Sequence, residues 1–429
     1  MPSSSDGCKP SARDQSRQNL WKHRFGLTAA TPFLTLSAVT LTLLTAADVY
    51  APAPLGLQHL LLGGGRILWM GAEPFDLPAA LRHACQVVDL AGQRLIPGLI
   101  DLHVHITGGG GESGFASRVP PVPLSQFTTA GVTTVVGLLG TDDVARGTRE
   151  LLASVYALRE QGLTAYGYTG GYHLPPATLT GSLRGDLVFI EPLLGIGEIA
   201  ISDHRSSQPT LDELLRVAAE AHVAGLMTGK AGIVHLHLGD GPRGLALVRA
   251  ALAGSELPPR VFHPTHVNRR RALFDEAIDL ARSGATIDVT AFPVAADTDA
   301  YSAAEALDRY LESGAPRERI TISSDAGGCL PCFDAEGRVT AMDVGASGAL
   351  LATLRELLEC GVSLEAALPA FTANPAQLLR LRAKGRIAVG ADADVVAIDG
   401  AGRASTVIAG GIVNVRDGVV ARRGAFESG

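Results

Sequence analysis

The chain has 429 residues, of which 46% are hydrophobic and 18% charged, so it can bury a core of barrel size and a smaller domain besides. Its net charge of −7 and pI near 5.9 argue against a nucleic-acid partner, which would favour a basic surface. The five cysteines are odd in number and irregularly spaced, which argues against a disulfide framework and favours the cytoplasm.

The first forty residues differ from the rest of the chain. Residues 1–25 are polar and basic, and residues 26–47 carry no charge. Many threonines make this stretch polar for a membrane helix, and no clear cleavage site follows it. We interpret residues 1–40 as a disordered leader, with a secretory signal peptide as the alternative, and predict no membrane partner.

Apolar runs broken by glycines lie near both ends of the chain, in residues 41–98 and 381–429. Short runs of this kind are typical of strands. Because both ends share the pattern and the middle does not, we predict one small β-sandwich domain built from both termini.

Residues 99–380 alternate between strand-like and helix-like stretches. We expect eight buried strands, at residues 99–106, 132–140, 163–170, 194–202, 233–240, 261–267, 285–290 and 320–327. We expect the helices at residues 142–161, 210–228, 242–255, 269–283 and 301–313, with further helical segments in 346–381. This alternation predicts an α/β protein with a (β/α)8 TIM-type barrel.

Several of the expected strands end in residues that bind metal ions. His103 and His105 end the first strand, and because alternate strand residues point the same way, both imidazoles can reach one ion. Strands four, five, six and eight offer Glu198, His235 or His237, His266 and Asp325. A lone strand histidine is more often a core residue, but ligand types at five strand ends predict a metal site at the barrel mouth.

This arrangement resembles the amidohydrolase superfamily, which has HxH on strand one, a carbamylated Lys or a Glu on strand four, His on five and six, and Asp on eight. The matching residues are His103, His105, Glu198, His237, His266 and Asp325. Longer strings are similar to the isoaspartyl (β-aspartyl) dipeptidases: DLHVHITGGGGESG at 101–114, TGGYHLP at 169–175, AISDHRS at 200–206, PTHVNR at 264–269 and SSDAGG at 323–328. The similarity runs from about residue 41 to the C-terminus.

The resemblance implies a metal-dependent peptidase that hydrolyses β-aspartyl dipeptides through a metal-activated water. It implies zinc as the cofactor, with one or two ions per subunit and two favoured. Asp325 is then both a ligand and the catalytic base, and Tyr172 stabilises the oxyanion. The expected substrate-binding residues are Gly110, Glu112, Thr141, Tyr172, Arg205, Arg269 and Cys329. Relatives form octamers, so the resemblance also implies a cytoplasmic homo-oligomer.

Two positions depart from the family's pattern. Glu198 stands where well-known members have a Lys that forms a carbamate, which removes dependence on carbon dioxide and opens the question of metal number. Glu191 lies seven residues earlier and does not align. Cys329 stands in place of a substrate-contacting Ser and forms a CxxC with Cys332, which we interpret as two ordinary thiols rather than a redox pair or a zinc knuckle.

Two other functions stay open on the sequence alone. The same fold could serve an N-acyl amino acid deacylase or a cyclic-amide hydrolase, although Glu112, Tyr172 and the two arginines favour a dipeptide. A non-catalytic metal-binding or scaffold protein is the alternative from another class. The complete ligand set and the intact Asp325 argue against it.

Overall fold

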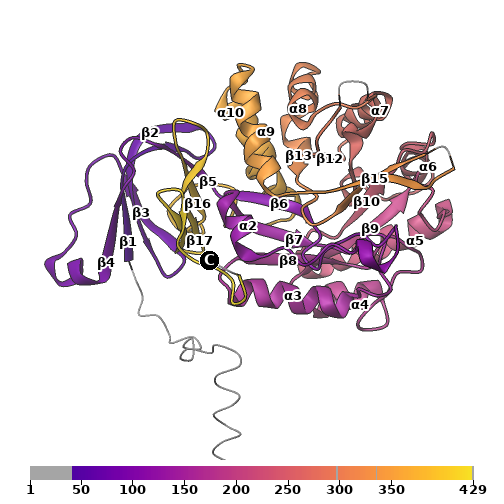
Figure 1. Ribbon diagram of the computed structural model, residues 1–429, viewed down its shortest axis with the longest axis horizontal. Coiled ribbons are helices and arrows are strands. Elements are labelled where there is room, and N and C mark those ends of the chain that lie inside the picture. The colour runs from indigo at the N-terminus through magenta and orange to yellow at the C-terminus, as the bar shows by residue number, and fades with distance from the viewer. Residues whose placement is uncertain (1–40, 296–297, 335, 428–429) are drawn as a thin grey trace, which may run out of the picture. The chain divides into compact units, whose positions relative to one another are not determined.

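The computed structural model describes residues 41–295, 298–334 and 336–427, so the leader expected at residues 1–40 lies outside the described residues. Residues 41–429 form one unit, which Figure 1 shows with the N-terminal strands in indigo beside the C-terminal strands in yellow. None of the helices in the described ranges combines the length and apolarity needed to cross a bilayer.

The two ends of the chain share one nine-stranded sheet. Its strands are β1 (Leu41–Tyr50), β2 (Pro54–Gly63), β3 (Arg66–Gly71), β4 (Cys85–Asp89), β5 (Arg94–Pro97), β16 (Val395–Ile398), β17 (Ala404–Ala409), β18 (Ile412–Arg416) and β19 (Val419–Val420). The ends meet where β16 runs antiparallel to β5, with Val395 opposite Pro97. Strands from both termini therefore lie in one sheet, as the prediction of a single β unit requires. The closure of this sheet into a sandwich and the domain boundaries stay predictions.

The middle of the chain is a TIM-type barrel. Six parallel strands form one sheet in the order β11-β10-β9-β8-β7-β6, and two more form a parallel pair. They are β6 (Leu99–Val104), β7 (Val132–Gly137), β8 (Thr164–Thr169), β9 (Leu193–Ile201), β10 (Ile233–Leu238), β11 (Phe262–Thr265), β12 (Ile287–Thr290) and β13 (Ile320–Ser323). A parallel bridge between Val104 and Ala326 joins the end of β13 to β6, so the eight expected strands are all present.

Helices follow the barrel strands (Figure 1). They are α2 (Leu124–Thr129), α3 (Thr148–Glu160), α4 (Leu183–Phe189), α5 (Leu211–Thr228), α6 (Ala246–Ala253), α7 (Arg271–Arg282), α8 (Ala303–Glu312), α9 (Gly348–Glu359), α10 (Leu364–Ala367) and α11 (Ala373–Leu378). Helix α5 begins at a capping box, in which Thr210 and Glu213 satisfy each other's backbone N–H groups. Almost every residue of the barrel strands is buried, as expected for strands covered on both faces.

The structure corrects two details of the expected elements. Helix α3 begins at Thr148 rather than near residue 142, because the Asp142 carboxylate accepts the backbone N–H of Ala145 and forms a turn there. After the eighth strand, a hairpin of β14 (Cys329–Phe333) and β15 (Val339–Val344) was not expected from the sequence. This hairpin begins four residues after Asp325 and therefore lies beside the predicted site.

Candidate active site

The end of strand β6 carries the HxH pair. His103 and His105 are both buried, and they face Asp325, which follows β13. Oδ1 of Asp325 lies 3.1 Å from Nε2 of His105 and 3.4 Å from Nε2 of His103. The ligand atoms of these three residues lie within 4.8 Å of one another. The first and eighth strands thus meet as a group able to hold a metal ion.

Glu198, on strand β9, lies at the centre of the whole cluster. One oxygen, Oε1, lies 3.6 Å from Nε2 of His105. The other, Oε2, lies 3.6 Å from Nε2 of His103, 3.1 Å from Nδ1 of His237 and 3.7 Å from Nε2 of His266. A second group with ligand atoms within 4.8 Å of one another contains His103, Glu198 and His266. The two oxygens of one carboxylate therefore face two sets of histidines.

Two of the cluster's residues have left-handed backbone conformations. His266 has φ 61° and Asp325 has φ 54°, in a region that costs a non-glycine residue on the order of 1 kcal/mol or more. The loop after β11 is braced, because Nδ1 of His266 lies 2.7 Å from Oγ1 of Thr290 and the Asn268 amide donates to the carbonyl of Thr290. These contacts fix the His266 side chain and the loop that carries it.

The chemistry of the cluster fits a divalent metal. Burial lowers the pKa of His103 and raises that of Glu198 well above its usual range, because each charged form is poorly solvated there. Nε2 of His103, Oε1 of Glu198 and Oδ1 of Asp325 are buried without a hydrogen-bond partner among the described residues. A Cβ at Gly140 would lie 2.7 Å from the His105 ring, so glycine leaves room for it. Imidazole nitrogens and carboxylates with free lone pairs are ligands that zinc and related metals accept.

Tyr172 and Asp203 both contact the His237 ring. The Tyr172 hydroxyl lies 2.7 Å from Nδ1 of His237, and Oδ2 of Asp203 lies 3.0 Å from its Nε2. Arg205 donates from Nη2 to the same carboxylate oxygen at 2.8 Å. Although burial raises the pKa of Asp203, hydrogen bonds from His237 and Arg205 bring it far below its usual range. Asp203 is therefore a carboxylate that orients both partners.

The other predicted substrate residues gather beside Arg205. Glu112 accepts a hydrogen bond from the Thr141 hydroxyl at 3.0 Å and lies 3.4 Å from Nη1 of Arg205. Burial, with the nearby Glu112 carboxylate, raises the pKa of the Cys329 thiol to about 12. Gly110 bridges to Arg118 in the same loop. One carboxylate, one guanidinium and two neutral groups thus lie together at the rim.

A pocket of about 370 Å³ opens at this rim. Its charged lining is two arginines and three aspartates, Arg205, Arg269, Asp240, Asp325 and Asp343, and Nε of Arg269 lies 3.6 Å from Oδ1 of Asp240. Its apolar lining includes Phe292, Leu330 and Phe333, the last two from the unexpected hairpin. Charged groups of both signs beside an apolar wall suit a small molecule that has both charged and apolar parts.

Sequence reasoning placed the expected ligands together but missed several neighbours. Asp203 lies within the quoted AISDHRS string, and its position two residues before Arg205 was the available signal. His235, the less favoured histidine of strand five, contacts His103 and His263 instead of Glu198. Glu191 lies just before β9 and pairs with Arg159 at the surface, away from the cluster.

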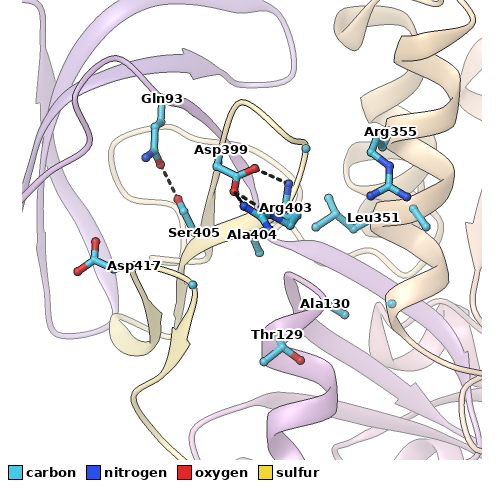
Figure 2. Close-up of a pocket in the computed structure, with 14 residues that line it drawn as sticks. Gln93, Thr129, Ala130, Leu351, Arg355, Asp399, Arg403, Ala404, Ser405 and Asp417 are labelled. Carbon is cyan, nitrogen blue, oxygen red and sulfur yellow. Dashed lines mark hydrogen bonds and ion pairs between the residues drawn. The ribbon is translucent and has the colours of Figure 1, made fainter.

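A larger cavity, of about 690 Å³, lies between the terminal sheet and helix α9 rather than at the barrel mouth. Figure 2 shows two pairs of its polar groups bonded to one another, Gln93 with Ser405 and Asp399 with Arg403. Neither potential metal-binding group of the described residues lies there. Its size therefore reflects the junction of sheet and barrel.

Residues 94–421 match the amidohydrolase family, and the chain belongs to that family. It is similar to the crystal structure of a β-aspartyl dipeptidase from Fervidobacterium islandicum AW-1 in complex with the β-Asp-Leu dipeptide. The two are 40% identical with a TM-score of 0.85, and the match covers 90% of this chain and 99% of that one. A second structure of the Fervidobacterium enzyme gives 39% identity and a TM-score of 0.81. The resemblance stated from the sequence is confirmed.

Curated relatives are imidazolonepropionases. The protein of Ralstonia nicotianae is 37% identical over 127 residues, which span only 30% of its length. The protein of a Ruegeria species is 26% identical over 361 residues, or 85% of its length. These matches support the family and leave the substrate to other observations.

Proposed function

We propose that this chain is a metal-dependent dipeptidase that hydrolyses β-aspartyl (isoaspartyl) dipeptides. The observation that carries the proposal is the 40% identity, over 90% of the chain, to a β-aspartyl dipeptidase crystallised with β-Asp-Leu. The charge pattern of the site supports it independently. A dipeptide zwitterion linked through its β-carboxyl has one ammonium and two carboxylates, and Glu112, Arg205 and Arg269 offer one anion and two cations.

The proposed cofactor is zinc, with two ions favoured. His103, His105 and Asp325 would hold one, and His237 and His266 the other. Glu198 would serve both groups, since Oε1 faces His105 while Oε2 faces His103, His237 and His266. His103 belongs to both groups of potential ligands. When bound, the metal supplies Lewis-acid polarisation of the carbonyl and lowers the pKa of a water. Glu198 then takes the place of a carbamylated lysine. Gly197 helps, because a Cβ there would lie 2.5 Å from the carbonyl oxygen of His235, so β9 approaches β10 closely.

Asp325 is the proposed proton carrier. Burial raises its pKa, but the nearby imidazoles of His103 and His105 outweigh this and bring it well below the usual range. It is therefore a carboxylate at neutral pH, ready to accept a proton from the attacking water and deliver it to the leaving amine. Burial raises the pKa of Tyr172 well above its usual range, so its hydroxyl stays protonated. It can donate to the oxygen that gains charge as the carbonyl is attacked.

The substrate's charged ends fit the rim. Glu112 would accept the free α-amino group, and Arg205 and Arg269 would each bind a carboxylate through paired N–H donors. Arg205 is already held, because Asp203 fixes one edge of its guanidinium and the Phe333 ring lies 5.2 Å from it. Thr141, Gly110 and Cys329 would complete the pocket. The cytoplasmic location and the homo-oligomer stay predictions.

A second substrate class rests on the imidazolonepropionase relatives. An N-acyl amino acid deacylase or a cyclic-amide hydrolase would use the same metal cluster. Such substrates lack a free α-amino group beside the scissile bond and give Glu112 no partner. The behaviour of Glu112 variants therefore separates the two classes.

The test measures the zinc content of the purified protein together with hydrolysis of β-Asp-Leu and α-Asp-Leu. Bound zinc with cleavage of the β-linked peptide alone would support the proposal, and E112Q should then raise KM for β-Asp-Leu. Bound zinc without cleavage of β-Asp-Leu, but with turnover of an acylated amino acid or a cyclic amide, would replace it by the second class. Absence of bound metal after zinc reconstitution would overturn both.

A further inference from the structure

A line of buried histidines leads away from His103 on the side opposite to the metal cluster. Nδ1 of His103 lies 2.8 Å from Nε2 of His235, and Nδ1 of His235 lies 2.8 Å from Nδ1 of His263. All three side chains are 0% exposed. We call these three residues the histidine chain. Only His103 among them takes part in the proposed catalysis, so the other two are buried polar groups without a role in it.

The histidine chain leads to a carboxylate on strand β12. Nε2 of His263 lies 3.3 Å from Oγ1 of Thr321, and that hydroxyl donates to Oδ1 of Asp288 at 2.7 Å. Asp288 also accepts hydroxyl hydrogen bonds from Thr265 and Ser323 at its other oxygen. Three donors around one buried carboxylate stabilise its charged form, although burial raises its pKa to about 7. Strand seven, which supplied no expected ligand, thus contributes the terminal acceptor.

Proton counting gives the chain a direction. Each hydrogen bond between two imidazole nitrogens needs one N–H donor and one bare acceptor nitrogen, so each ring in this line has a single N–H. Nε2 of His103 faces Glu198 and Asp325 and must be unprotonated to bind a metal. Its proton is then on Nδ1 and is donated to His235. His235 in turn donates from Nδ1 to His263, and His263 donates from Nε2 to Thr321.

We infer that His235, His263, Thr321 and Asp288 are positioning residues that fix the tautomer and ring orientation of His103, so that Nε2 is presented to the metal. The inference rests on the metal site of the proposed function. A hydrogen bond from the second nitrogen of a ligand histidine sets its tautomer and raises its basicity. Here that bond is relayed through two more imidazoles to the carboxylate. The Tyr168 ring stacks on His235 at 5.0 Å and 28°, which holds the middle ring in plane.

An ordinary packing role explains these contacts less well. A buried apolar side chain would fill the same space without the cost of removing ring nitrogens from water. The four nitrogens of His235 and His263 all lie within hydrogen-bonding distance of a partner, in one continuous line. Strand pairing also places these side chains next to each other, because His235 stands directly opposite His263 in the register of β10 and β11.

The test compares two nearly isosteric variants of His263 in the full-length protein. H263L removes the acceptor for His235, whereas H263N keeps an amide oxygen close to the position of Nδ1. The measurements are the apparent zinc affinity by competition with a chelator and the visible spectrum of the Co²⁺-substituted protein. We expect H263L to weaken zinc binding by about 10- to 100-fold and to change the spectrum. We expect H263N to weaken it by only about threefold, because it keeps the acceptor for His235 but not the link to Thr321.

A threonine pair provides the control for packing. T321V breaks the link to Asp288, and T134V makes the same change at a buried strand threonine whose hydroxyl has no partner among the described residues. T321V should weaken zinc binding by about threefold or more, and T134V should leave it unchanged. If H263L fails to fold, the threonine pair decides the question.

Equal zinc affinity in T321V and T134V, or equal loss in H263N and H263L when both are folded, would overturn the inference. Failure of the wild type to bind zinc would instead remove the proposed metal site. Zinc binding by the wild type with no difference among the variants removes only the role of the histidine chain.

Discussion

Two clusters of buried charge in this molecule differ in how completely they are paired. At the barrel mouth, oxygens of Glu198 and Asp325 and a nitrogen of His103 have no hydrogen-bond partner among the described residues. At the junction of barrel and terminal sheet, Lys384 lies between two carboxylates. Its Nζ is 2.9 Å from Asp392 and also bonds to Asp394.

The second cluster is complete within the protein. The other oxygen of Asp394 accepts the backbone N–H of Gly410, and the other oxygen of Asp392 pairs with Arg66. Lys384 and Asp394 are 8% and 6% exposed, so neither needs water to satisfy it. A buried ion pair of this kind holds two segments in register. The mouth cluster has the same burial but keeps free lone pairs, and this difference marks it as the one built to receive a ligand.

The largest effect on activity is expected from a substitution in the mouth cluster. In D325N the carboxylate that carries the proton becomes an amide of the same size, which cannot accept a proton from water. We expect kcat for β-Asp-Leu to fall by about 10²- to 10⁴-fold. The measurement is steady-state kinetics at matched zinc content. Wild-type activity in D325N at full zinc occupancy would show that another group is the base.

The paired cluster should respond through stability instead. K384M leaves the buried Asp394 carboxylate without its cation, and we expect a loss of about 3–5 kcal/mol in the free energy of unfolding. Urea unfolding measures it. K230M is the comparison, because Lys230 donates only to the carbonyl oxygens of Leu187 and Ile190 and should cost less. Folded K384M should keep its kcat, and a stability equal to that of wild type would remove the distinction between the clusters.

Tyr172 lies at the edge of the mouth cluster. Y172F keeps the ring and removes the hydroxyl that lies 2.7 Å from Nδ1 of His237. We expect kcat to fall by about 10²- to 10³-fold with little change in KM, since the hydroxyl donates mainly in the transition state. A rise in KM at constant kcat would instead assign Tyr172 to substrate binding.

A smaller effect is expected in how the stability contributed by the Lys384 cluster changes with pH. The carboxylates of Asp394 and Asp392, outweighing burial, raise the pKa of Lys384 above its ordinary 10.5. A group whose pKa is raised by folding stabilises fully below its unfolded pKa and loses that contribution as pH rises through the folded value. The stability difference between wild type and K384M should therefore be constant up to about pH 10 and shrink above it. Unfolding curves at pH 7, 9 and 11 measure it, and a difference that grows with pH would contradict the assignment.

The sequence could predict that the residues of the mouth cluster lie close together, because strand geometry is local. Alternation along β6 places His103 and His105 on one side, and parallel strands deliver their last residues to one end of the barrel. The left-handed conformations of His266 and Asp325 were not visible in the sequence, since they depend on the loops that follow.

Contacts across the barrel could not be predicted in the same way. His103 on β6 contacts His235 on β10, although three strands lie between them in the sheet. The distance between these two side chains depends on how the barrel closes. Lys384 was not singled out, because a lone lysine eight and ten residues before two aspartates predicts a solvated surface. The terminal sheet buries it only by joining residues from both ends of the chain.

Glu198 predicts that added bicarbonate has no effect on the activity of the wild type. A lysine at this position would need carbon dioxide to provide a carboxylate, whereas Glu198 has its own, with both oxygens already facing the histidines. Wild-type activity should therefore be the same in bicarbonate-depleted buffer and in buffer with added bicarbonate. E198A should lose both zinc and activity under either condition, because it removes a carboxylate whose two oxygens face four of the proposed ligand histidines. Strong stimulation of the wild type by bicarbonate would mean that a carbamate forms elsewhere in the site, and Glu198 would then be a structural carboxylate like those around Lys384.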